Sequence, residues 1–415
     1  MKKLLALLLT LLLVLSLVAC GGNNGNSTGT DGSTDDSTGG STDGETVIAK
    51  LAVVGPLTGE YKTEFGDESV AATQMAIDEW NEKGVTVDGK KVVFEMVTFD
   101  DAGKAEEGAA LAQQIVADED IIAVPSAHYQ SAVCLVACPT YQQGGLLALA
   151  TGASHPDYTK IGDYVVRNNC TDFDDSQTTV QLAYRKGYRR IAVTAPETDY
   201  GVSCSEMVVE WIGDMQDLGI DIEFVGQEYF PEVTDDYSSV LSNLNAMDPD
   251  CVINFGAYSQ VTPFCVQKQR TDADWAIVAP SNCFDENLIK VGGDAVEGLA
   301  MTTLFDPNSE NPLIQDFVTK LQDEYGIMAN HIGALAYDSA NYICYLVEQT
   351  GSLDRETLKN AAHEIEMQGV TGTIVFGDDN ECGKILTVVE VKDGAFVGSD
   401  IQLAKWDDFL AEAAA

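Results

Sequence analysis

The stretch VIAKLAVV, residues 47–54, followed by GPLTG, residues 55–59, decides the fold of this chain. Its nearly continuous apolar run is typical of a strand buried on both faces, and the glycines and proline after it predict a loop. Residues 67–83 follow with apolar side chains at helical spacing, and Gly84 is the expected stop. A buried strand, a loop and a helix form the repeating unit of a parallel α/β sheet.

The same alternation continues outward from this unit. Strands are predicted at residues 92–99, 121–124 and 146–150, with helices at 104–117 and 131–143. After Arg167 the pattern restarts, with predicted helices at 174–186, 203–218, 236–246 and 260–270 and strands at 190–195, 222–230, 251–255 and 276–279. A further strand is expected beyond Gly298, then helices at 312–325, 332–349 and 355–363, and hairpin-like strands at 372–376, 385–391 and 395–397.

Two α/β lobes, each with a doubly wound parallel sheet, are therefore predicted. Residues 46–415 also exceed the length that one hydrophobic core usually serves. We expect residues 47–168 plus 299–377 in the first lobe and 169–298 plus 378–415 in the second, joined by a hinge of several strands. Ligands of open α/β sheets bind beyond the carboxyl ends of the strands, so two facing lobes predict a cleft that closes by hinge motion.

The N-terminus predicts export. Lys2 and Lys3 precede an apolar run at residues 4–17, which is typical of a secretory signal and shorter than a membrane-spanning helix. Leu-Val-Ala before Cys20 resembles a bacterial lipobox, which implies a signal peptide at residues 1–19 and a lipid anchor on Cys20; the alternative is an ordinary signal peptide with an incidental cysteine. The polar segment that follows predicts a flexible tether over residues 20–45. We expect the protein on the outer face of the bacterial cell membrane.

Charge and cysteine usage exclude several partners. The chain has 66 acidic and 23 basic residues, a net charge of −43, which argues against nucleic acid or anionic lipid. Of its ten cysteines, nine lie beyond Cys20 without a C-x-x-C pair or a cysteine and histidine cluster of zinc spacing. No metal site is therefore predicted, and most of these thiols are expected to be small buried apolar groups.

Hydroxyl side chains follow two adjacent predicted strands. Ser131 and Ser154 both fall near helix starts or turns, where a hydroxyl and free backbone N–H groups can jointly bind a carboxylate. Each serine alone could equally be a helix N-cap. Two of them after adjacent strands favour a shared anion site.

Several motifs, in order along the chain, resemble the Leu/Ile/Val-binding family of periplasmic binding proteins, the amino-acid receptors of ABC transporters. They are AVVGPLTG at residues 52–59, the Phe65-Gly66 step, FDDA at 99–102, Pro156 after Ser154, and DYG at 199–201. The resemblance covers nearly all of residues 46–415. It implies a monomer without a cofactor that binds a small amino acid, of the branched-chain type first, and delivers it to ABC-transporter permease subunits.

The resemblance also implies roles for particular residues. Ser131 matches a hydroxyl that binds the α-carboxylate of the ligand. Ser154 matches a hydroxyl that does the same and also contacts the ammonium, and Gly152 matches a carbonyl that accepts from the ammonium. Phe65 and Tyr129 would form the walls of the side-chain pocket.

From the second lobe, Tyr200 matches an aromatic lid and Tyr258 a residue that closes over the ligand. One departure concerns the acid that the family often places after the strand ending at Pro280, where it pairs with the ammonium. This chain has Ser281-Asn282 there, with Asp285 four positions after Ser281. Either Asp285 substitutes for that acid, or the ligand is not an ordinary α-amino acid, as for the family's amide and aromatic-acid binders.

Enzyme signatures are lacking. The sequence has no G-x-S-x-G, P-loop or H-E-x-x-H motif and no dinucleotide fingerprint after the first strand, so no catalytic residue is expected. His128 and His155 lie in the two ligand loops and could act as a base or a metal pair, although loop histidines are more often solvated or hydrogen-bonded. A surface adhesion or sensory lipoprotein is the alternative of another class.

Overall fold

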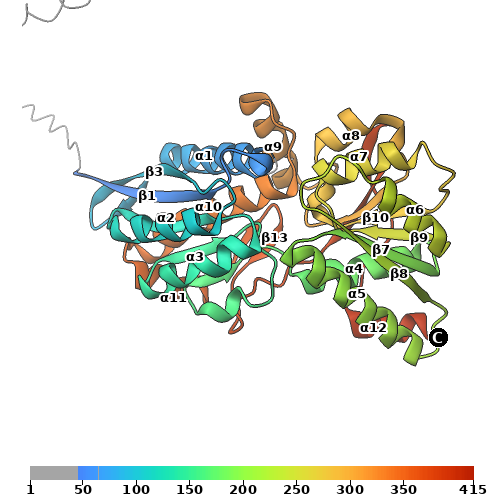
Figure 1. Ribbon diagram of the computed structural model, residues 1–415. Coiled ribbons are helices and arrows are strands. Elements are labelled where there is room, and N and C mark those ends of the chain that lie inside the picture. Colours follow the sequence, from blue (N-terminus) through green and yellow to red (C-terminus); the bar gives the residue numbers. More distant parts are fainter. Residues whose placement is uncertain (1–44, 64) are drawn as a thin grey trace, which may run out of the picture. The chain divides into compact units, whose positions relative to one another are not determined.

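The computed structural model describes residues 45–63 and 65–415; the predicted signal peptide, Cys20 and the tether up to residue 44 lie outside the described residues. Figure 1 shows two β-sheets, each with helices packed against its faces. The prediction of an α/β fold with two mostly parallel sheets is confirmed. In the described residues, no helix is both long and apolar enough to cross a membrane.

The first sheet has six strands in the order β2-β3-β1-β4-β5-β6. All neighbouring pairs are parallel except β2 and β3. Its strands are β1 (Thr46–Gly55), β2 (Val85–Val87), β3 (Lys90–Asp100), β4 (Ile121–Ala127), β5 (Leu147–Ala150) and β6 (Val165–Arg167). Its helices are α1 (Gly66–Lys83), α2 (Ala105–Ala117), α3 (Ser131–Gln143), α10 (His331–Thr350) and α11 (Arg355–Ala362). The central strand β1 contains the apolar run of residues 47–54, and Leu51 to Val54 are fully buried.

The second sheet has seven strands in the order β15-β14-β11-β10-β9-β7-β8. Its strands are β7 (Arg190–Pro196), β8 (Glu223–Phe230), β9 (Cys251–Asn254), β10 (Ala276–Ala279), β11 (Ala300–Thr303), β14 (Thr387–Lys392) and β15 (Ala395–Gly398). Its helices are α4 (Asp172–Arg185), α5 (Asp199–Asp217), α6 (Ser238–Met247), α7 (Tyr258–Lys268), α8 (Glu286–Gly292) and α12 (Trp406–Ala413). The antiparallel β14–β15 hairpin was predicted from its turn at residues 392–394.

One segment differs from the predicted lobe boundaries. Residues from 299 onward were assigned to the first lobe, but β11 pairs with β10 and β14 in the second sheet. Gly298 lies in a turn within the second lobe, because the chain adds one more parallel strand, β11, to the second sheet before it crosses to the first lobe. It then passes through α9 (Pro312–Lys320) and a π-helical turn (Leu321–Tyr325) to α10. The antiparallel pair β12 (Met367–Gly369) and β13 (Gly372–Ile374) precedes the return to β14.

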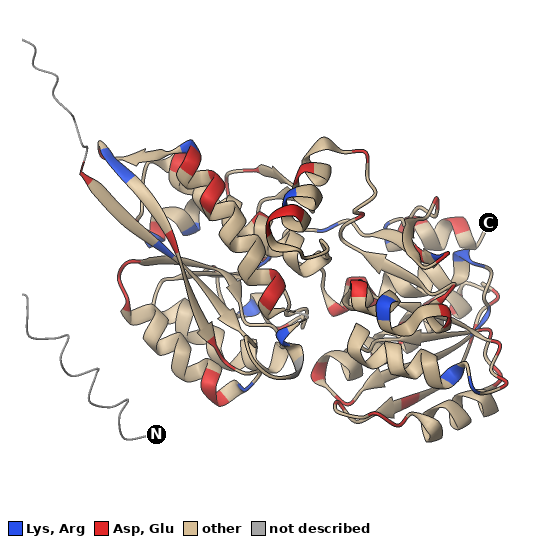
Figure 2. Cartoon of the chain, turned by 90° about the horizontal axis from the view of Figure 1, so that it is seen from above, with Lys and Arg blue, Asp and Glu red and all other residues tan. Residues whose placement is uncertain are grey.

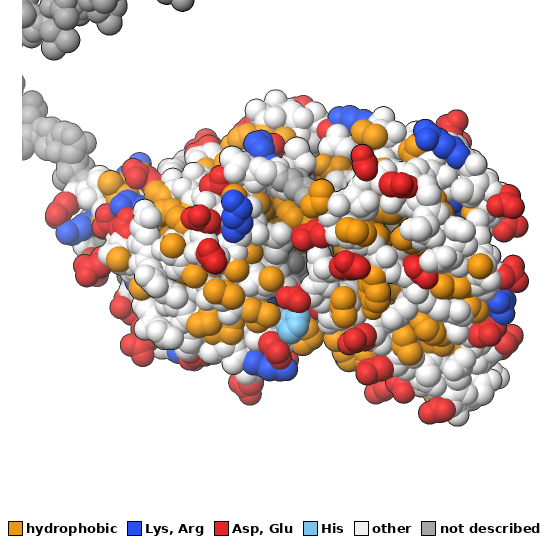
Figure 3. All heavy atoms as spheres, viewed as in Figure 1, with side chains coloured by type: hydrophobic (Ala, Val, Ile, Leu, Met, Phe, Trp, Pro, Cys, Tyr) orange, Lys and Arg blue, Asp and Glu red, His pale blue; other side chains and the backbone are white. Residues whose placement is uncertain are grey.

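The described cysteines lie mostly in the interior of the protein, whereas acidic side chains lie over its surface. Eight of the nine cysteines of the described residues are buried and Cys382 is partly exposed, as was expected of most of them. Burial raises the pKa of Cys251, so this thiol stays protonated and unreactive. Figures 2 and 3 show acidic residues scattered over both sheets and their helices, with few basic residues between them.

Candidate functional site

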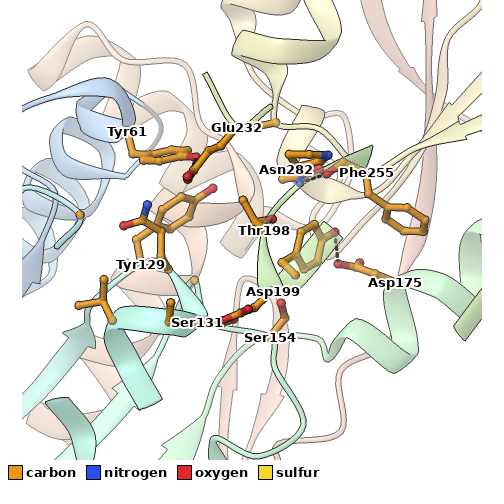
Figure 4. A pocket seen from close by; sticks show the side chains of 18 of the residues that line it. Tyr61, Tyr129, Ser131, Ser154, Asp175, Thr198, Asp199, Glu232, Phe255 and Asn282 are labelled. Atoms are coloured by element: carbon orange, nitrogen blue, oxygen red, sulfur yellow. Dashed lines mark hydrogen bonds between the residues drawn. The ribbon is translucent and has the colours of Figure 1, made fainter. Parts of the chain in front are cut away.

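A cavity of about 360 Å³ lies where the parallel strands of both sheets end. From the first sheet, the residues after β1, β4 and β5 line it; from the second, the residues after β7, β8, β9 and β10 do so. This is the position at which open α/β sheets bind ligands, because loops at the carboxyl edge converge there. The lining includes Tyr61, Tyr129, Ser131, Gly152, Ser154, Asp175, Thr198, Asp199, Tyr200, Glu232, Phe255, Gln260, Asn282 and His331 (Figure 4).

Ser131 begins helix α3, whose first turn has no side-chain cap. The Val133 N–H donates to the Gln130 carbonyl at 3.0 Å, so the N–H groups of Ser131 and Ala132 are the ones that can serve an anion, which the helix dipole also favours. The Ser131 hydroxyl accepts a hydrogen bond from the backbone N–H of His155 at 3.3 Å, which ties the start of α3 to the loop after β5. Ser154, in that loop, is 5% exposed and faces the same cavity. The structure therefore brings the two serines together, as expected for a shared site.

Gly152 is held where the loop after β5 touches the loop after β4. A Cβ at this position would lie 2.5 Å from the Tyr129 ring and 2.9 Å from the Tyr129 carbonyl oxygen, so only glycine fits. The Gly152 carbonyl accepts from the Asn169 side-chain amide at 3.1 Å. Tyr129 lines the cavity and stacks at a tilt on Tyr61 and on Phe65, with 5.5 Å between ring centroids in each pair. This tight packing places Gly152 among the residues that line the cavity.

Two of the aromatic residues expected in the site are not among the residues that line the cavity. Phe65 is fully buried beneath Tyr129 and fills the space that a side chain at Gly55 would occupy. Tyr258 is 9% exposed, and its hydroxyl shares a 2.7 Å hydrogen bond with the hydroxyl of Thr63. Tyr258 thus links the second lobe to the loop after β1, beside the cavity.

Asp285, the residue expected to pair with the ammonium, is also not among the lining residues. It is the N-cap of α8, where its carboxylate accepts from the Asn287 N–H at 2.7 Å. It is 4% exposed, and burial raises its pKa. Glu68 of α1 lies close enough for the Asp285 charge to add to the rise that burial causes in the pKa of Glu68. The geometry therefore gives Asp285 a capping role.

The two loop histidines have structural partners. His128 is fully buried, with Nδ1 2.7 Å from Asp101 and Nε2 3.1 Å from the Tyr141 hydroxyl. His155 accepts at Nδ1 from the Asp157 N–H at 3.1 Å. Within residues 45–63 and 65–415, no group of three or more histidine, cysteine or acidic side chains is arranged to hold a metal ion.

Tyr200 lines the cavity and rests on a buried carboxylate. Its hydroxyl donates to Asp175 at 3.0 Å, and its ring packs edge-on against Phe255 with 6.2 Å between centroids. Burial raises the pKa of Asp175 to about 7, although hydrogen bonds from Cys170 and Tyr200 oppose the rise. The position of Tyr200 therefore depends on a carboxyl group that is half-protonated near neutral pH.

Asp175→Asn is expected to stabilise the protein, and more at pH 8 than at pH 5. The unfolded chain releases this proton near pH 4 and the folded chain near pH 7, so the unfolded state binds fewer protons between these values. Stability from this group is thus greatest below pH 4 and falls as the pH rises to 7. Asparagine cannot ionise, so the gain should be about 1–3 kcal/mol larger at pH 8. Urea unfolding of both proteins at pH 5 and pH 8 measures this difference in the free energy of unfolding.

Asp217→Asn, on the exposed face of α5, removes the same charge at the surface and serves as the control. Its stability should follow that of the unsubstituted protein at both pH values. If Asp175→Asn also follows the unsubstituted protein at pH 5 and pH 8, Asp175 titrates normally and the prediction is wrong.

Sequence reasoning missed Glu232 and Tyr61. Glu232 follows the end of β8 by two residues, and Tyr61 lies in the 3-10 turn (Glu60–Lys62) after the loop of β1. The Tyr61 hydroxyl donates to the Glu232 carboxylate at 2.7 Å. Both residues follow parallel strands, so their position in the sequence already placed them in loops near a ligand site. The sequence does not show, however, which way side chains in these loops point.

Comparison with known proteins agrees with this geometry. The family model described as periplasmic binding protein matches residues 49–395. The leucine-specific-binding protein of Salmonella typhimurium is 25% identical over 257 residues, 61% of this chain and 66% of that protein, just under two thirds of its length. The crystal structure of a leucine binding protein LivK from Thermotoga maritima superposes with a TM-score of 0.76 and 26% identity, covering 87% of this chain and 99% of that one.

A solute-binding protein of an ABC transporter from Rhodopseudomonas palustris, crystallised with 3,4-dihydroxybenzoic acid, shares the fold. Its TM-score is 0.75 at 20% identity, with 86% of this chain and 96% of that chain covered. The family model matches far more than half of this chain, along both sheets and every loop that lines the cavity. The chain belongs to the periplasmic binding protein family.

Proposed function

We propose that this protein is the extracytoplasmic solute-binding component of an ABC importer and binds a small amino acid in its cavity by hinge closure. The observation that carries the proposal is the uncapped start of α3 at Ser131, facing the same cavity as Ser154. Such a site holds a carboxylate by hydroxyl and backbone donors without a basic side chain. The protein acts as a binding protein and not as an enzyme, in keeping with its family.

Branched-chain amino acids are the first candidates for the cargo, because the relatives and the Thermotoga structure are named for leucine binding. The carboxylate would bind Ser131 and Ser154, with the Gly152 carbonyl close to the ammonium. Tyr129 would line the side-chain pocket, backed by Phe65, and Tyr200 would close from the second lobe. Residues 47–168 would form the capturing lobe together with the later segments that pack on its sheet.

A second candidate cargo is an aromatic acid or an amide. The same serines bind any carboxylate, and the solved Rhodopseudomonas protein of this fold is described in complex with 3,4-dihydroxybenzoic acid. The missing acid at Ser281-Asn282 also favours a ligand without an ordinary α-ammonium.

The remaining partners belong to the same proposal. Permease subunits of the importer would receive the cargo from a monomeric binding protein. Lipidated Cys20 would hold the protein at the outer face of the membrane, with residues 21–45 as the tether. No cofactor or nucleic acid is required.

A thermal-shift screen against amino acids, small amides, aromatic acids and short peptides tests the proposal. A ligand present at 100 times its Kd is expected to add about 2.7 kcal/mol of stability, which raises the unfolding midpoint. A rise in the unfolding midpoint with leucine, isoleucine or valine supports the amino-acid role. A rise with aromatic acids or amides alone indicates that the cargo is such a compound instead. If no solute shifts the midpoint, the solute-binding role is wrong and an adhesion lipoprotein becomes the better hypothesis. Recovery of unchanged ligand separates binding from turnover.

A further inference from the structure

Glu232 is fixed in the cavity at two points. Its carboxylate accepts from the Tyr61 hydroxyl of the first lobe at 2.7 Å, and its own backbone carbonyl accepts from the Gln260 side chain at 2.6 Å. Gln260 is 4% exposed and is itself held, because its side-chain oxygen accepts from the Ala257 N–H at 3.1 Å. The half-buried carboxylate of Glu232 is therefore set in place before any ligand arrives.

The negative charge of Glu232 is not neutralised within the described part of the chain. Glu232 forms no ion pair there, and none of the described residues that line the cavity is a lysine or arginine. His331 lines the cavity, but burial lowers its pKa to about 3, so the imidazole is neutral at physiological pH. Glu197 and Asp199 add only negative charge to the lining, and the carboxyl group of Asp175 adds no positive charge. A carboxylate partly removed from water and without a cation favours a positively charged ligand.

Two more polar groups in the lining lack partners. His331 is 7% exposed, and its buried Nδ1 has no hydrogen-bond partner among residues 45–63 and 65–415; the same holds for the buried side-chain oxygen of Asn282. Buried polar atoms nearly always have a partner, so such atoms in a cavity wall mark a place where a ligand supplies one. These atoms are independent of Glu232 and point to a polar ligand in the same cavity.

The serines that would bind the carboxylate and the side chain of Glu232 lie toward opposite ends of the cavity. In Figure 4, Tyr61, Glu232 and Asn282 lie toward one end, and Ser131 and Ser154 lie toward the other, with the Tyr129 ring between them. The ammonium of an α-amino acid is bonded to the carbon next to its carboxylate, so it stays near the serines. The group that meets Glu232 is therefore the far end of the ligand.

We propose that Tyr61 and Glu232 form a subsite for a cationic group at the far end of the cargo, so that the preferred ligand is a basic amino acid. This inference rests on the proposed function, in which Ser131 and Ser154 hold the carboxylate. An aliphatic end would bury Glu232 against apolar atoms, whereas an ammonium or guanidinium would pair with it. The faces of Tyr61 and Tyr129 would also attract that cation.

Calorimetric titration of the purified chain with lysine and with norleucine tests the subsite, because norleucine is lysine without the terminal ammonium. Lysine is expected to bind at least tenfold more tightly than norleucine. Glu232→Gln should weaken the affinity for lysine about ten- to a hundredfold and leave the affinity for norleucine unchanged. Glu228→Gln is the matched control, since it removes the same charge from β8 outside the cavity lining, and it should change neither affinity.

Tyr61→Phe tests the positioning of the carboxylate. Losing the phenol hydroxyl should reduce the ratio of lysine to norleucine affinity several-fold, a readout that a general loosening of the fold would not move.

Three outcomes separate the hypotheses. If norleucine or leucine binds as tightly as lysine, or if Glu232→Gln and Glu228→Gln act alike on lysine, the cationic subsite is wrong and the proposed function stands. If lysine, norleucine, leucine, isoleucine and valine all fail to bind, the amino-acid role fails together with the subsite. Tight lysine binding that Glu232→Gln and Tyr61→Phe weaken and Glu228→Gln does not supports both.

Discussion

Replacing Ser131 and Ser154 together by alanine is expected to weaken binding of the ligand more than a hundredfold. Hydrogen bonds to a charged group contribute about 1.5–3 kcal/mol each, and two of them exceed the 2.8 kcal/mol or so that corresponds to a hundredfold change in Kd. The fold should persist, because the Ser131 hydroxyl makes only a 3.3 Å contact with the His155 N–H and α3 keeps its backbone. Calorimetry measures the affinity, and circular dichroism the unfolding midpoint.

The matched control changes Ser239 and Ser242 of α6 to alanine. Both serines are exposed and lie outside the cavity lining, so affinity and midpoint should stay unchanged. Affinity that survives the Ser131 and Ser154 changes would mean that the carboxylate binds elsewhere. Equal loss of affinity and of the folded state would mean that these serines serve the fold alone.

Arg167→Met is expected to destabilise the protein by about 3–5 kcal/mol, because it removes a buried cation and leaves the partly buried Glu381 carboxylate without its cationic partner. Arg167 is fully buried, and its Nε donates to the Glu381 oxygens at 2.9 and 3.1 Å. Its Nη1 and Nη2 donate to the carbonyls of Ala153 and His155 at 3.0 and 2.8 Å. These carbonyls flank Ser154, so ligand affinity should fall as well. Urea denaturation measures the loss of stability.

Arg185→Met provides the comparison at the surface. Arg185 pairs bidentately with Glu412, whose side chain is 62% exposed, and exposed pairs contribute about 1 kcal/mol or less. A loss of stability from Arg167→Met no larger than that from Arg185→Met would contradict the anchoring role of Arg167.

The architecture was predictable from sequence because buried parallel strands are continuous apolar runs, as in β1 and β4. The placement of Ser131 and Ser154 at the cavity followed from the rule that loops after parallel strands face the ligand, whereas Tyr129, Gly152 and Tyr200, which also line it, were implied by the resemblance to the Leu/Ile/Val-binding family. That rule locates a loop but does not orient its side chains.

Side-chain orientation in these loops is also what keeps three of the expected residues out of the cavity lining. Phe65 and Tyr258 turn into the protein beside the cavity, and Asp285 turns back to cap α8. Glu232 faces the cavity only because Tyr61 and Gln260, distant in sequence, hold it there. Contacts between residues 171 positions apart leave no local pattern to read.

The packing of α10 on the first sheet sets the order in which the molecule can assemble. Strands β1 to β6 are complete by Arg167, yet Tyr342, Leu346 and other residues of α10 belong to their core, and the Trp80 indole of α1 donates to Asn341 at 2.8 Å. A chain that emerges from its N-terminus therefore leaves the part of this sheet that α10 covers exposed until about residue 350 follows. The first lobe to begin folding is completed only after most of the second has been made, and in the interval it needs protection from aggregation.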